Sequence, residues 1–149
     1  MRSDWTALAK QFQTQLYGMV FKGEDPSDYI RATVEKTRAG EMDEQLVYRK
    51  RLRRKLEQYV KKVPPQVHAA RLADELRQQQ GLAPRYQNKG WIRYVITLDG
   101  LEPVDHRQSP MDYQHYIDRQ LKPVADAILP FIELDFDSLV DGQLGLFDV

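Results

Sequence analysis

The chain has 149 residues, of which 42% are hydrophobic and 30% charged, and it contains no cysteine. This length corresponds to one domain with a modest core. The high charge and the lack of an apolar run of about 18–20 residues argue against a membrane-spanning helix. Without cysteine there are no disulfides or thiolate metal sites, and polar residues directly after Met1 indicate no signal peptide. We therefore expect a soluble intracellular domain, and the lack of cysteine fits a reducing cytoplasm.

The net charge is zero, but the charges are segregated along the chain. Between residues 47 and 62 there are eight basic residues and one acid, Glu57, which gives this segment a net charge of +7. Between residues 130 and 149 there are five acids and no base. The pattern predicts a polyanion-binding surface in the first segment and an acidic approach to the C-terminus in the second.

Two amphipathic helices are predicted at the N-terminus. The first has Asp4 as its N-cap and ends at Gly23. Its apolar residues recur at spacings of three and four: Leu8, Phe12, Leu16, Met19 and Val20. The second begins near residues 25–26, where proline suits the first helical turn, and ends by Gly40. The short turn between the two helices predicts antiparallel packing.

Residues 46–54 follow a period of two, which is typical of a strand. One face then carries Val47, Arg49, Arg51 and Arg53, and the other carries Leu46, Tyr48, Lys50 and Leu52. A strand would place successive arginines of the first face about 6.6 Å apart. A helix is the alternative, because arginine and lysine are good helix formers. We favour the strand.

The second half of the chain predicts a helix, a strand and a further helix. The helix follows residues 64–65, both proline, and ends at Gly81. Residues 91–98 are rich in β-branched and aromatic side chains and form the clearest strand. Asp112 is expected to cap a long last helix, which prolines 123 and 130 bend or break. Its buried side is predicted to carry Tyr116, Leu121, Val124, Ile128 and Phe131. The fold class is therefore α+β, mostly helical with a small antiparallel sheet.

Five segments in chain order carry motifs of one protein family. Residues 2–5 read Arg-Ser-Asp-Trp, and residues 52–59 place a basic stretch before a Leu-x-x-Tyr. Residues 65–73 begin with Pro-x-Val, residues 90–95 read Gly-Trp-Ile-Arg-Tyr-Val, and residues 112–123 pair two tyrosines with Gln-Leu-x-Pro. Collinear along the chain, these motifs resemble the thumb region of family B DNA polymerases. A serine replaces the second arginine of the family's Arg-Arg-Asp-Trp signature.

Within that family, residues 46–54, 71–75 and 129–133 are most similar to the bacterial polymerase II branch. The resemblance implies a thumb domain over residues 1–134 and a C-terminal tail over residues 135–149. It also implies a longer parent nucleotidyltransferase of DNA replication and repair, whose exonuclease, palm and fingers precede this segment. The aspartates that bind Mg²⁺ in such polymerases lie in the palm. We therefore expect no catalytic residue, metal site or cofactor here.

The basic segment is the first candidate site. Lysine and arginine bind DNA phosphates through counterion release, largely independent of sequence, and this suits a grip that slides along duplex. The predicted residues for binding primer–template DNA are Arg49, Lys50, Arg51, Arg53, Arg54, Lys55 and Tyr59. The alternative is a solvated charged face without a partner.

The second candidate is the tail sequence Gln143, Leu144, Gly145, Leu146 and Phe147. It resembles the peptide with which bacterial polymerases bind their sliding clamp. Gln143, Leu144, Leu146 and Phe147 are the expected clamp-binding residues, three as apolar anchors and the glutamine through its amide. The alternative is that these side chains fold back onto the helical core.

Other motifs carry less weight. Residues 135–138 superficially resemble the Asp-x-Asp-Ser of a polymerase palm, but acidic capping of a short terminal helix is the preferred interpretation. The three histidines are too scattered for a metal site. Trp5 and Trp91 are expected in the core. The competing functional hypothesis is a free-standing adaptor that binds a partner protein and has no DNA role.

Overall fold

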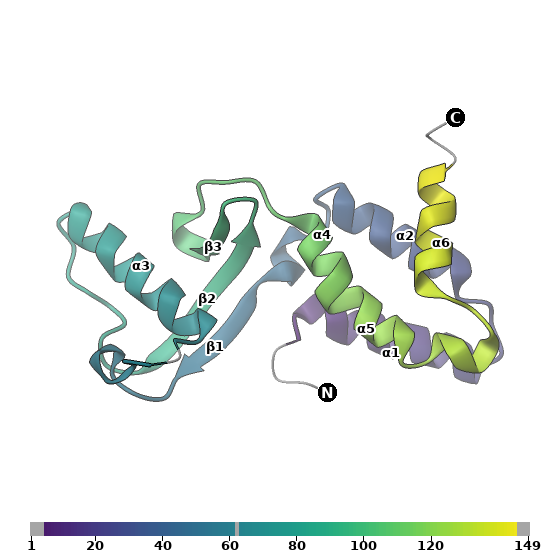
Figure 1. Cartoon of the computed structure of the whole chain (residues 1–149), viewed down its shortest axis with the longest axis horizontal. Coiled ribbons are helices and arrows are strands. Elements are labelled where there is room, and N and C mark those ends of the chain that lie inside the picture. Colours follow the sequence, from purple (N-terminus) through teal and green to yellow (C-terminus); the bar gives the residue numbers. More distant parts are fainter. Residues whose placement is uncertain (1–4, 62, 146–149) are drawn as a thin grey trace. The chain divides into compact units, whose positions relative to one another are not determined.

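The computed structural model describes residues 5–61 and 63–145. The chain divides into two compact units, Met1–Leu46 with Tyr113–Val149 (unit 1) and Val47–Asp112 (unit 2). Unit 1 is helical, and unit 2 contains a three-stranded sheet (Figure 1). This division was not predicted from the sequence. Among the described residues, no helix has the length and apolar character needed to cross a membrane.

Unit 1 begins with both predicted helices, α1 (Ala7–Phe21) and α2 (Ser27–Arg38), followed by a short 3-10 helix, η1 (Asp43–Leu46). The expected N-cap, Asp4, lies outside the described residues, and Thr6 caps α1 by accepting a hydrogen bond from the Ala9 N–H at 3.3 Å. The rings of Phe12 and Tyr29 stack with centroids 5.8 Å apart, so the two helices pack against each other.

The C-terminal part of unit 1 is a chain of short helices. They are α4 (Tyr113–Tyr116), the π-helical turn η4 (Ile117–Leu121), α5 (Lys122–Asp126), η5 (Leu129–Ile132) and α6 (Phe136–Gly145). The wide turn ends two residues before Pro123, which has no N–H to donate. Tyr116, Leu121, Val124 and Ile128 are buried as predicted. The expectation for Phe131 is wrong. Its side chain is 83% exposed: α5 ends at Asp126, and Phe131 lies in η5, in which Leu129 is the buried residue.

Unit 2 is built on an antiparallel sheet in the order β1 (Tyr48–Leu52), β2 (Gly90–Thr97) and β3 (Gly100–Pro103). The predicted strands at residues 46–54 and 91–98 are confirmed, and so is the fold class. The third strand was not predicted. It follows a tight turn in which Gly100 adopts a φ of 103°, a conformation that favours glycine.

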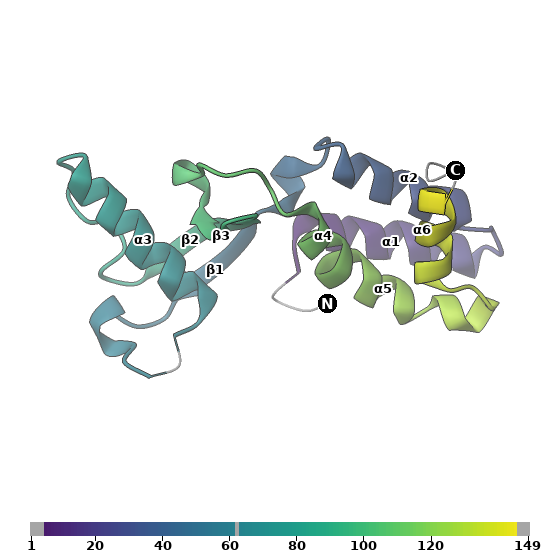
Figure 2. The same ribbon diagram turned by 45° about the horizontal axis from the view of Figure 1, so that its top comes forward.

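One face of the sheet is covered by α3 (Pro65–Gln79), the helix predicted after the two prolines (Figures 1 and 2). Alternation along the strands directs four buried side chains to this side: Tyr48, Leu52, Ile92 and Tyr94. The rings of Tyr48 and Tyr94 stack with centroids 5.2 Å apart. Small residues of α3, Ala69, Ala70 and Ala73, are also buried. On the opposite side of the sheet Arg49, Arg51, Trp91 and Arg93 are exposed, whereas Val95 and Thr97 at the other end of β2 are buried.

Candidate nucleic-acid interface

The sheet face opposite α3 is lined by arginines from two strands where β1 pairs with the first half of β2. Arg49 and Arg51 project from β1, and Trp91 and Arg93 project from β2. All four side chains are exposed. Arg49 lies directly opposite Arg93, and Arg51 lies directly opposite Trp91. We call these four residues the arginine face. Residues on one strand face are about 6.6 Å apart and cross-strand partners about 5 Å, so the cations form a compact group.

Trp91 is 50% exposed on the arginine face, so its expected place in the core is wrong. The period of two in β2 explains the difference, because Ile92 and Tyr94 take the side that faces α3. The guanidinium of Arg49 lies over the indole, 4.1 Å from the ring centroid. An arginine at this distance from a tryptophan makes a cation–π contact.

The arginine face has few counter-charges of its own. Within residues 5–61 and 63–145, no carboxylate lies within ion-pair distance of Arg49 or Arg51. Arg93 has a weak, exposed pair with Asp105 at 3.9 Å. Like charges placed directly opposite each other destabilise a sheet, as Arg49 and Arg93 are here. Stability of the fold therefore does not account for the placement of these two arginines opposite each other.

Carboxylates border the arginine face on the β3 side. Glu102 lies opposite Val95 and accepts a hydrogen bond from the Gln108 N–H at 2.7 Å. Burial raises the pKa of Glu102, but hydrogen bonds from Thr97 and Ser109, as well as Gln108, outweigh it and hold that pKa below its ordinary value. Together with Asp105, this charge confines the basic surface to β1, β2 and the loop after β1.

The loop after β1 continues the basic surface with Arg53, Arg54 and Lys55, all exposed. The Arg54 guanidinium lies over the Tyr59 ring at 4.7 Å, and the Arg54 N–H donates to the Tyr59 hydroxyl at 3.3 Å. Tyr59 itself is only 8% exposed. Its phenol therefore holds the loop in place.

The loop is also fixed to α3. A terminal nitrogen of Arg71 donates to the carbonyl oxygens of Leu56 and Tyr59, at 3.0 and 2.7 Å. On the same helix, the carboxylate of Asp74 accepts from the N–H groups of Arg85 and Tyr86, at 2.7 and 3.1 Å, and so anchors the segment that leads into β2. The loop and β2 thus share one rigid support.

The structure separates the predicted DNA-binding residues into three groups. Arg49 and Arg51 share the arginine face, and Arg53, Arg54 and Lys55 extend it. Lys50 points to the α3 side and is half-buried, and Tyr59 packs beneath the loop. The prediction missed Arg93 and Trp91. Alternation along residues 91–98 would have placed both on one face, but only the strand pairing brings that face beside the arginines of β1.

The C-terminal candidate is only partly described. Gln143 and Leu144 fall within the last turn of α6, whereas Leu146 and Phe147 lie outside the described residues. The carboxylate of Asp135 accepts hydrogen bonds from the N–H and hydroxyl of Ser138, both at 2.9 Å, so the capping interpretation is confirmed. Those two bonds, the backbone one first, lower the pKa of Asp135.

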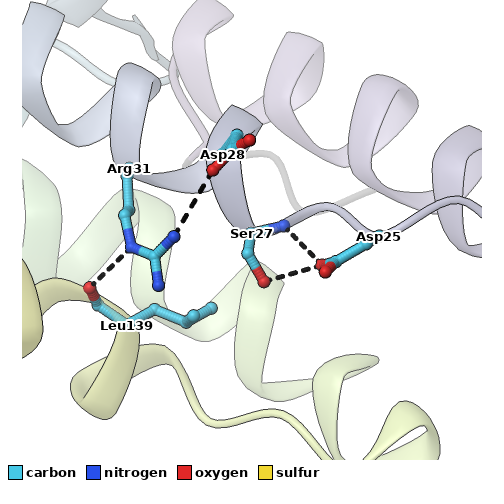
Figure 3. A network of polar contacts seen from close by, with 5 residues as sticks. All are labelled: Asp25, Ser27, Asp28, Arg31 and Leu139. Atoms are coloured by element: carbon cyan, nitrogen blue, oxygen red, sulfur yellow. Dashed lines mark hydrogen bonds and ion pairs between the residues drawn. The ribbon is translucent and has the colours of Figure 1, made fainter.

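The first turns of α6 pack against other helices of unit 1. Phe136, Leu139 and Val140 are buried. Figure 3 shows Arg31 of α2 between two partners, the Leu139 carbonyl oxygen, to which its Nε donates at 3.3 Å, and Asp28 at 3.5 Å. An ion pair between Lys122 and Asp137 adds a second link. The residues proposed to bind the clamp therefore follow a helix whose first turns are fixed by these contacts.

The described residues contain no group of three histidine, cysteine, aspartate or glutamate side chains that could hold a metal ion.

No family model matches the chain. In sequence it is homologous to DNA polymerase II of Escherichia coli (strain K12), with 56% identity over 147 residues. That match covers 99% of this chain and 19% of the polymerase, so the chain spans about a fifth of its relative. In structure it resembles part of the family B DNA polymerase from the hyperthermophilic archaeon Pyrobaculum calidifontis. The TM-score is 0.62 at 26% identity, covering 82% of this chain and 17% of that one. The predicted resemblance to family B DNA polymerases is confirmed.

Proposed function

We propose that this chain is the thumb region of a family B DNA polymerase and that it holds primer–template duplex through the sugar–phosphate backbone. The observation that carries the proposal is the arginine face, where cations from two strands gather with few internal counter-charges. The homology to a DNA polymerase supports DNA as the polyanion that binds this surface. The basic loop at Arg53, Arg54 and Lys55 extends the same surface.

Arginines that contact phosphates and not base edges suit the binding of duplex DNA by a polymerase. A polymerase holds every sequence that it has just copied, and phosphate contacts carry no sequence information directly. Each neutralised phosphate releases condensed counterions, so affinity depends steeply on salt. A flat, basic sheet face can therefore hold duplex tightly at low salt and still let it slide.

DNA synthesis itself belongs, in this proposal, to a longer nucleotidyltransferase. The palm of the parent enzyme would supply the aspartates and Mg²⁺, and this chain would keep the duplex in place for replication and repair in the bacterial cytoplasm. The other polymerase domains are then partners of residues 1–134, with residues 135–149 as the tail.

The test is fluorescence anisotropy of a labelled primer–template duplex, titrated with the chain from low to physiological salt. Combined Arg49→Ala, Arg51→Ala and Arg53→Ala substitutions should weaken binding at least tenfold at low salt. The slope of log affinity against log salt should fall by about 0.9 for each phosphate that the variant no longer neutralises.

The matched control removes the same charge from unit 1, with Lys10→Ala, Lys22→Ala and Lys36→Ala, all exposed in the structure. This variant should retain nearly all of the affinity. Equal reductions in the two triple variants would show that only the overall charge matters and would contradict the proposed surface.

We further propose that the tail binds a bacterial sliding clamp through Gln143, Leu144, Leu146 and Phe147. The anchored start of α6 supports this, because it fixes one end of a segment whose other end carries apolar anchors. Tethering would raise the effective concentration of the polymerase at its primer end.

Immobilised clamp should capture the chain, and Leu146→Ala with Phe147→Ala should abolish capture. A control with Val60→Ala and Leu82→Ala also removes two exposed apolar side chains and should bind normally. Retained binding by the Leu146 and Phe147 variant would refute the tether. Clamp binding without DNA binding at low salt would favour the adaptor alternative.

A further inference from the structure

We propose that Trp91 is a positioning residue for DNA binding: its indole holds the guanidinium of Arg49 on this face of the sheet, where the N–H groups can reach a phosphate. This inference rests on the proposed function and deepens it, because it names a residue that acts through another. Trp91 itself is not required to touch the DNA.

The strand register places Trp91 among three arginines. It lies directly opposite Arg51, two residues before Arg93 on the same strand, and diagonal to Arg49. The diagonal neighbour is the one whose guanidinium lies over the indole, at 4.1 Å. Tryptophan has the strongest attraction for a cation among the aromatic side chains. The ring therefore offsets part of the repulsion that Arg49 meets from Arg93 across the strands.

The exposure of Trp91 also needs an explanation. A tryptophan that is 50% exposed contributes only part of its apolar area to folding. Phe21 and Phe131 are exposed as well, at 80% and 83%, but among the described residues neither has an arginine over its ring. The distinguishing feature of Trp91 is its contact with a cation of the candidate interface.

Stacking suits arginine because of the geometry of its side chain. The five N–H donors of a guanidinium lie in its plane and point outward, so a ring against its flat side leaves all of them free for phosphate oxygens. A free arginine gives up rotamer freedom when it binds, and that entropy cost weakens affinity. An arginine already held by a ring has given up part of this freedom beforehand, and the duplex then binds more tightly.

The other ligand to consider is an unpaired base stacked on Trp91, as on single-strand binding surfaces. Arg49 already covers the ring at 4.1 Å, so a base would have to displace it or use the other side of the indole. The observed contact therefore favours a duplex backbone held by arginine.

The experiment is a double-mutant cycle, with duplex affinity measured by anisotropy over a range of salt. Trp91→Ala should weaken binding about threefold to fivefold, the range expected for a cation–π contact, with the salt slope unchanged because Arg49 keeps its charge. Arg49→Ala should weaken binding and lower the slope by about one. The double variant should bind like Arg49→Ala alone, because the ring has no guanidinium left to position.

Conservative variants separate positioning from simple support of the fold. Trp91→Phe keeps a ring and should restore most of the affinity, whereas Trp91→Leu keeps an apolar side chain without a π face and should not. If Trp91→Ala lowers the melting temperature too far for titration, the comparison of Trp91→Phe with Trp91→Leu still tests whether the ring positions Arg49. Arg49→Lys should bind duplex more weakly than the wild type. Adding Trp91→Leu to Arg49→Lys should cause no further reduction in affinity, because an ammonium group lacks the flat surface of a guanidinium.

Three results would overturn the inference. They are additive effects in the double variant, wild-type affinity for Trp91→Leu, and a reduction confined to single-stranded DNA, which would indicate base stacking. In each case the proposed function survives if the Arg49, Arg51 and Arg53 triple variant still binds duplex more weakly. If that triple variant binds normally, the proposed function fails first.

Discussion

The arginine face of unit 2 differs from the ion pairs and hydrogen bonds that involve charged side chains in unit 1. In unit 1 several charged side chains have partners within the same unit: Asp25 accepts from Ser27, Arg31 donates to the Leu139 carbonyl oxygen, and Lys122 pairs with Asp137. In unit 2, Arg49 and Arg51 have no carboxylate within ion-pair distance among the described residues. Paired charges in unit 1 serve the fold, and the arginine face of unit 2 is open to an outside anion.

The same contrast exists among arginines within unit 2. Arg71 is exposed on α3, yet one of its nitrogens binds the carbonyl oxygens of both Leu56 and Tyr59. Arg51 is also exposed and pairs with no carboxylate in the described part of the chain. Exposure alone therefore does not identify a binding residue. What separates the two is whether the guanidinium already has acceptors in its own chain.

The largest expected effect is in unit 1, at Gln120. This side chain is 3% exposed and accepts from the N–H and hydroxyl of Thr6, at 2.8 and 2.9 Å. Gln120→Ala leaves buried donors unpaired and should lower the free energy of unfolding by about 2–3 kcal/mol in urea. Duplex affinity should not change at temperatures where the variant is folded. Gln114→Ala, which removes an exposed hydrogen bond to Asp118, is the control and should cost under about 0.5 kcal/mol.

The second prediction concerns the internal support of unit 2. Asp74→Ala removes the acceptor for the Arg85 and Tyr86 N–H groups and should cost about 1–2 kcal/mol. Hydrogen exchange of these two amides should accelerate while that of α1 stays slow. Glu75→Ala changes a neighbour on the same helix and serves as the control. Unchanged amide protection in Asp74→Ala would show that the carboxylate does not hold this segment.

The third prediction concerns substitutions on the arginine face that weaken DNA binding without lowering the stability of the fold. Arg49→Ala relieves the repulsion with Arg93 but also removes the contact with Trp91, and so should leave stability unchanged within about 0.5 kcal/mol. Arg51→Ala breaks no ion pair among the described residues and should be neutral or slightly stabilising. Both should weaken duplex binding. Arg31→Ala, the counterpart in unit 1, should destabilise and leave binding intact. A marked drop in stability in Arg51→Ala would remove the distinction between the two units.

The smallest effect is a pH dependence at the start of α6. Hydrogen bonds from Ser138 lower the pKa of Asp135 in the folded state. Their contribution is therefore complete above the unfolded pKa of about 3.9 and is lost as the pH falls through the lower, folded value. The stability difference between wild type and Asp135→Ala should be constant from about pH 5 to 8 and should shrink below about pH 4. A difference that persists in stronger acid would mean that the cap does not depend on the carboxylate charge.

Much of the fold was predictable because its signals are local. Three helices, α1, α2 and α3, and the strands β1 and β2 follow from apolar periodicity and from proline and glycine at their ends. The missed strand, β3, is only four residues long and contains a glycine and a proline, which strands seldom favour. Its pairing with β2 stabilises it, and that pairing is tertiary.

The candidate site divides in the same way. The +7 charge and the period of two in residues 46–54 identified Arg49, Arg51 and Arg53 without any structure. The same pattern already assigned Lys50 to the other strand face. The packing of Tyr59 needed the structure, because a basic run does not reveal which neighbouring phenol is held within the loop.

By itself, therefore, the sequence determined the helices α1, α2 and α3, two of the three strands, the concentration of basic charge and the likeness to family B polymerases. Tertiary structure decided that Arg93 stands opposite Arg49 and that Trp91 lies under its guanidinium. It also decided that residues 47–112 form a unit of their own. The physical reason is that strand register joins segments about forty residues apart. Side-chain packing against α3 selects that register, and no local pattern encodes it.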